Sequence, residues 1–63
     1  MEEKLKHLLQ HWIEHSIEHT NKYEEWAKKI ENEKPEVAEC LKKAVEKFRE
    51  GEEFLREALH KLS

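Results

Sequence analysis

The sequence predicts an all-α protein, an antiparallel hairpin of two long helices that dimerises into a four-helix bundle. Apolar residues recur with the helical period on both sides of a single break, "ENEKPE" at residues 31–36. Neither half shows the strict apolar–polar alternation of a β-strand. Two helices on a short loop form a hairpin but cannot enclose a core, so a second copy is expected to complete the bundle.

The first helix is expected to run from Glu3 to about Asn32, because Asn is suited to end a helix and residues 33–34 then form the link. At about 100° per residue, one broad face of this helix is apolar. That face comprises Leu5, Leu8, Leu9, Trp12, Ser16, Tyr23, Trp26, Ala27 and Ile30. Ile13 and Ile17 lie on its flank.

The second helix is expected from Pro35 to Leu62, since proline fits the first turn of a helix and disfavours helix at the residue before it. Its apolar face comprises Val37, Leu41, Ala44, Val45, Phe48, Leu55, Leu59 and Leu62. Gly51, the only glycine, lies inside this helix, where the missing side chain would leave room for ligands or for a close helix approach. Residues 1–63 form one domain.

Composition narrows the classes of function. Charged residues make up 43% of the 63 residues, but both signs are mixed and the net charge is only −3, which argues against nucleic acid as a partner. No apolar run is long enough to span a membrane. A single cysteine, Cys40, and a charged start without an apolar stretch behind it predict a cytoplasmic protein.

Four histidines stand four residues apart, at His7, His11, His15 and His19. Residues at this spacing drift across a helix surface by about 40° per step, so His7 is expected to face water and His19 to lie within the apolar face. Two such imidazoles on consecutive turns can chelate one metal ion. The alternatives are a solvated polar face for the outer pair and hydrogen-bonded imidazoles at the core edge for the inner pair.

Glu52 is an acidic residue on the apolar face of the second helix, and a buried Glu is rare unless it is paired. In an antiparallel hairpin it is level with His15 and Ser16 and about one turn from His19. Glu52 could instead reach Arg49 or Arg56 on its own helix.

The leading hypothesis is therefore a small soluble homodimer that binds a transition metal, Zn, Fe, Ni or Cu, at mid-bundle. The expected ligands are His15, His19 and Glu52, with His11, Glu18 and His7 as secondary candidates and Tyr23 and Ser16 as supporting residues. The alternative is a structural or protein-interaction hairpin with incidental histidines. No catalytic residue is assigned.

The stretch "LLQHWIEHSIEHTNKYEEWA", a turn, and "EVAECLKKAVEKFREGEEFLREALHKL" resemble short uncharacterised prokaryotic and archaeal proteins. These proteins share a helix with the pattern H-W-x-E-H-x-x-E-H, followed by an acidic helix rich in Ala and Leu. The resemblance covers nearly the whole chain. It implies a natural helical hairpin, and it carries no established activity.

Overall fold

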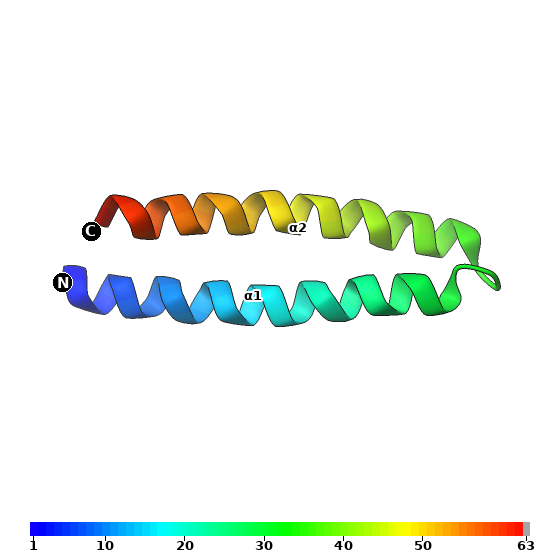
Figure 1. The fold of residues 1–63 in the computed structure, drawn as a ribbon, viewed down its shortest axis with the longest axis horizontal. Coiled ribbons are helices and arrows are strands. Elements are labelled where there is room, and N and C mark those ends of the chain that lie inside the picture. The colour runs from blue at the N-terminus through cyan, green and yellow to red at the C-terminus, as the bar shows by residue number, and fades with distance from the viewer. Residues whose placement is uncertain (63) are drawn as a thin grey trace.

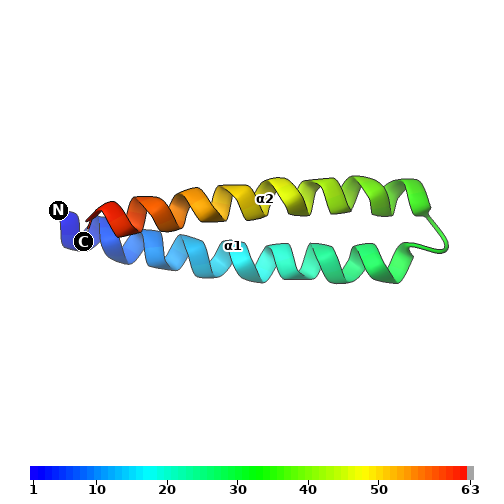
Figure 2. The same cartoon turned by 45° about the horizontal axis from the view of Figure 1, so that its top comes forward.

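The computed structural model describes residues 1–62 and consists of two long helices. Helix α1 spans Glu2–Ile30 and helix α2 spans Pro35–Leu62. They run antiparallel along their whole length, with both chain ends at one end of the molecule and the loop at the other (Figures 1 and 2). The predicted helical hairpin is confirmed. Neither helix is long and apolar enough to cross a membrane.

The loop is longer than expected, because α1 ends at Ile30 and not at Asn32. The backbone N–H groups of Glu33 and Lys34 both donate to the carbonyl of Ile30, at 3.1 and 2.7 Å, which closes the last turn. No residue here has positive φ, so Asn32 does not close the helix in a left-handed conformation. Lys34 precedes proline, which disfavours helix there, and its carbonyl accepts the first bond of α2 from Ala38.

The two helices meet along a narrow seam, in which buried and half-buried residues alternate at spacings of three and four. On α1 the seam comprises Leu9, Ile13, Ser16, Thr20, Ala27 and Ile30. On α2 it comprises Ala38, Leu41, Val45, Glu52, Leu55, Leu59 and Leu62. This is the repeat of a coiled coil, which keeps one stripe of each helix turned toward its partner. The core of the hairpin is therefore one layer of side chains.

A second set of large apolar side chains is left exposed. It comprises Leu5, Leu8, Trp12, Tyr23, Trp26, Val37 and Phe48, which we call the apolar side. Trp12 and Trp26 are 46% and 56% exposed, whereas Ile13, expected on the flank of the apolar face, is buried. The wide apolar face of α1 contains two neighbouring stripes, and the hairpin buries only one.

The helical period places the α1 members of the apolar side within about one-tenth of a turn on each side of their mean direction. Tyr23 and Phe48 touch across the helices, with ring centroids 5.4 Å apart, so the stripes of α1 and α2 lie on the same side of the hairpin. The opposite side is polar, since Asn21, Glu24 and Arg49 meet there.

Candidate functional site

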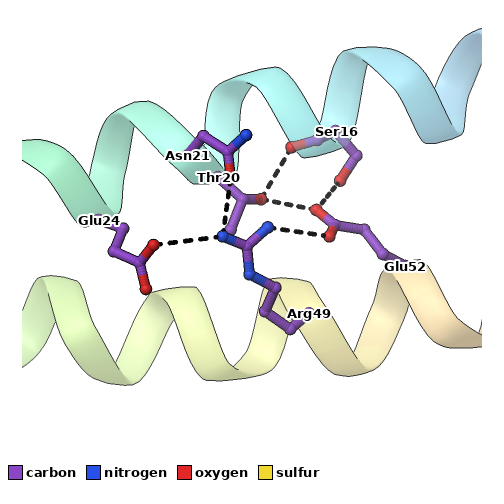
Figure 3. A network of polar contacts seen from close by, with 6 residues as sticks. All are labelled: Ser16, Thr20, Asn21, Glu24, Arg49 and Glu52. Atoms are coloured by element: carbon purple, nitrogen blue, oxygen red, sulfur yellow. Dashed lines mark hydrogen bonds and ion pairs between the residues drawn. The ribbon is translucent and has the colours of Figure 1, made fainter.

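The centre of the seam is polar. Glu52 is only 5% exposed, and its carboxylate Oε2 accepts hydrogen bonds from Ser16 Oγ at 2.7 Å and from Thr20 Oγ1 at 2.6 Å (Figure 3). Thr20 Oγ1 also lies 2.8 Å from the carbonyl oxygen of Ser16, so its single hydrogen is shared between two acceptors. This layer joins the two helices near the middle of the hairpin.

Arg49 closes the layer on the polar side of the hairpin (Figure 3). Its Nη1 lies 3.5 Å from Glu52 Oε1, and its Nη2 donates to Asn21 Oδ1 at 2.8 Å and lies 3.6 Å from Glu24 Oε1. The half-exposed guanidinium therefore faces the buried carboxylate on one edge and two polar groups of α1 on the other. Among residues 1–62, every buried side-chain polar atom has a partner.

The surroundings keep Glu52 ionised at neutral pH. Burial raises the pKa of this carboxyl group, but the hydrogen bonds from Thr20 and Ser16 and the charge of Arg49 together outweigh burial and hold the pKa below its ordinary value. Each carboxylate oxygen is directed at a donor from the protein, and the nearest charge is a cation. These contacts suit a structural carboxylate.

The histidine ladder lies on the surface of α1. Ring centroids are 4.2 Å apart for His11 and His15 and 6.4 Å apart for His15 and His19. His19 stacks on Tyr23 at 6.4 Å with 24° between the ring planes. The expected descent of the ladder into the core is wrong for the hairpin, because His7, His11, His15 and His19 are all exposed.

The predicted ligands do not converge within one chain. Among the described residues, no three His, Cys, Asp or Glu side chains are close enough to share a metal ion. Glu52 points into the seam, whereas the histidines lie outside it, and Glu18 is also exposed. Of the two supporting residues, Ser16 bonds to Glu52 and Tyr23 stacks on His19.

Sequence reasoning missed Thr20 as the residue that faces Glu52, although it placed Ser16 at the right height. His19 and Thr20 are neighbours on α1, about 100° apart around the helix. The signal that identifies Thr20 is the spacing of three and then four residues from Ile13 through Ser16 to Thr20. A helical wheel of all the apolar residues together hides this spacing.

Comparison with known proteins gives a family but no activity. Residues 5–62 match the family model described as a domain of unknown function, DUF8180. A protein of Archaeoglobus fulgidus named "Uncharacterized protein" is 56% identical over 57 residues, which cover 90% of this chain and 92% of the relative. No solved structure matches the chain. The chain belongs to the DUF8180 family.

Proposed function

We propose that the protein is a self-associating helical hairpin, in which two copies pack through their apolar sides to form a four-helix bundle. The observation that carries this proposal is the apolar side itself. It comprises seven large apolar residues, Leu5, Leu8, Trp12, Tyr23, Trp26, Val37 and Phe48. Large exposed apolar residues gathered on one side of a molecule are typical of protein interfaces.

The small core supports the same proposal. Within residues 1–62 only five hydrophobic residues are buried, Leu9, Ile13, Ala27, Ala38 and Val45, and two of them are alanines. A chain of 63 residues buries too little surface to be more than marginally stable alone. Covering the two Trp side chains would supply the missing apolar burial, because aromatic residues contribute the largest buried areas.

The dimensions suit a stable dimer. The Cα atoms extend over 48 Å along the hairpin and 14 Å across it. The outline of this face is therefore about 670 Å² on one copy and about 1,300 Å² on two, and an interface that covered it completely would lie at the lower end of the range of specific protein interfaces. The lone exposed Cys40 is compatible with the reducing cytoplasm, which we take as its compartment.

Sedimentation equilibrium tests the proposal. The wild-type protein is expected at twice the chain mass of 7.7 kDa at micromolar concentration. Trp12→Glu should give monomers, because it places a charge inside the interface. Gln10→Glu is the matched control, since it adds the same charge on the opposite side of α1 and should leave the dimer intact. A folded wild-type monomer would overturn the proposal.

A transition metal shared between the two copies is the second candidate function. His15 and His19 stand on consecutive turns with ring centroids 6.4 Å apart, next to the apolar side. One chain offers two imidazoles there, and a dimer in which the α1 helices of the two copies lie on each other offers four, the number that a tetrahedral zinc site needs. Zn, Fe, Ni and Cu all accept imidazole. Glu52 is not part of this version of the site, because the seam already engages it.

Calorimetric titration with zinc, on protein prepared without a His-tag or nickel resin, tests the metal site. One ion per dimer is expected, and His15→Ala or His19→Ala should abolish tight binding. His7→Ala is the matched control and should have no effect, because His7 lies farther from the apolar side. Absence of binding, or binding that survives both substitutions, would remove this candidate function.

A further inference from the structure

The apolar side carries a repeated pattern of large and small residues, with a spacing of seven. On α1, Trp12, His19 and Trp26 form a large row, and all three are exposed. On α2, Ala44, Gly51 and Ala58 form a small row at the same spacing. Seven residues make nearly two turns, so each row stays on one side of its helix.

The two rows are level with each other across the hairpin. Facing residues have numbers that add up to about 70, as for Asn21 and Arg49, and the equal rise of both helices extends this register along the molecule. Residue 12 is therefore level with 58, residue 19 with 51 and residue 26 with 44. Each large residue of α1 has a small residue of α2 beside it, so the large row is expected to stand higher than the small row, which we call the groove of the apolar side.

Gly51 has no role that one chain explains. A side-chain Cβ at this position would meet nothing within 4 Å, and no glycine of the chain has positive φ. Glycine in the middle of a helix is less favourable than any residue except proline. Gly51, at the centre of the small row, therefore weakens α2, and the packing of α2 against α1 does not require a glycine there. Close approach by another molecule at that point accounts for it.

We infer that a second copy covers the apolar side around a twofold axis parallel to the helices, with the large row of each copy seated on the small row of the other. Rotation about such an axis places α1 of one copy over α2 of its partner and keeps every residue at its own height. Trp12, His19 and Trp26 then lie over Ala58, Gly51 and Ala44 of the other copy. This inference rests on the proposed self-association and specifies its geometry.

The alternative twofold axis, perpendicular to the helices, fits the surface less well. It stacks α1 on α1 and α2 on α2, so that Trp12 meets Trp26, and it places the small rows opposite each other with a gap between them. Protein interfaces pack as densely as protein interiors, which favours ridges in grooves. The parallel axis also places the two loops at the same end of the bundle, whereas the perpendicular axis places them at opposite ends.

The position of the loops provides the decisive experiment. A spin label is attached at Glu33→Cys in a Cys40→Ser background, and the distance between labels is measured by pulsed electron paramagnetic resonance, with the mass measured on the same sample. The expected result is a dimer with a label separation below half of the 48 Å length of the hairpin. A dimer with labels about as far apart as that length would overturn the geometry and leave the self-association standing. A monomer would overturn both.

A matched pair of substitutions tests the seat at Gly51 separately. Gly51→Leu fills the groove and should weaken dimerisation by about tenfold or more, since overpacking a close contact is costly and occurs twice in a symmetric dimer. Glu53→Leu adds the same side chain on the opposite side of α2 and should leave the association constant unchanged. Equal effects of the two substitutions, or no effect of either, would contradict the proposed seat.

Discussion

Replacing Glu52 by alanine tests the polar layer at the centre of the seam. The substitution removes the carboxylate that accepts hydrogen bonds from Ser16 Oγ and Thr20 Oγ1. Ser16 Oγ then loses its acceptor, whereas Thr20 retains the carbonyl oxygen of Ser16 at 2.8 Å. Arg49 retains Asn21 and Glu24, and its side chain is 36% exposed, so the lost ion pair contributes little.

The expected loss follows from these contacts. A buried polar group left without its partner costs about 1–3 kcal/mol, and the lost contacts of the side-chain methylenes add about 1 kcal/mol. We therefore expect Glu52→Ala to lower the free energy of unfolding by about 2–4 kcal/mol per chain. A domain of this size has only about 3–9 kcal/mol in total, so the loss is a large share of it.

Urea unfolding followed by far-ultraviolet circular dichroism measures the effect, with all variants at one protein concentration. Glu53→Ala, on the exposed neighbour, is the control and should change stability by less than about 0.5 kcal/mol. Replacing the whole layer, as Ser16→Ala, Thr20→Val and Glu52→Leu together, should be neutral or stabilising, because no polar group is then left unpaired. A Glu52→Ala variant as stable as the control would refute the role given to this layer.

Two further outcomes are expected. The pKa of Glu52 is lower in the folded chain than its ordinary value of 4.5, so the ionised carboxylate contributes fully to stability above pH 4.5, and this contribution is lost as the pH falls through the lower pKa of the folded chain. The free energy of unfolding of the wild type, measured at decreasing pH, should show this loss. The same dependence on pH in Glu52→Gln would contradict it. Val45→Ala should lower the free energy of unfolding in urea by about 1–3 kcal/mol, because Val45 is buried in the seam. A change below about 0.5 kcal/mol, the scale of ordinary surface substitutions, would mean that the seam is not the core.

The hairpin could be predicted from the sequence because its signals are local. Pro35 marks the start of α2, and the helical periodicity on both sides of it defines two long amphipathic segments. The end of α1 was predicted two residues too late, since Asn is a residue type that often ends helices. The hydrogen bonds to the Ile30 carbonyl end the helix earlier.

The polar centre was only partly predictable. Glu52 stood out as an acid on an apolar face, and Ser16 followed from the height of antiparallel partners. Whether Thr20 or His19 faces Glu52 depends on which of two adjacent stripes α1 turns toward α2, and only the packing of side chains decides that. The stripe with the smaller residues lies in the seam, which leaves both Trp side chains on the outside.

Urea unfolding at two protein concentrations that differ a hundredfold tests most directly whether a second copy covers the apolar side and contributes to the stability of the fold. Because a partner that binds only the folded chain stabilises it by mass action, we expect the transition to shift to higher urea at the higher concentration, with a gain of about 2.7 kcal/mol per dimer. Superimposable transitions, with a folded chain at both concentrations, would contradict it.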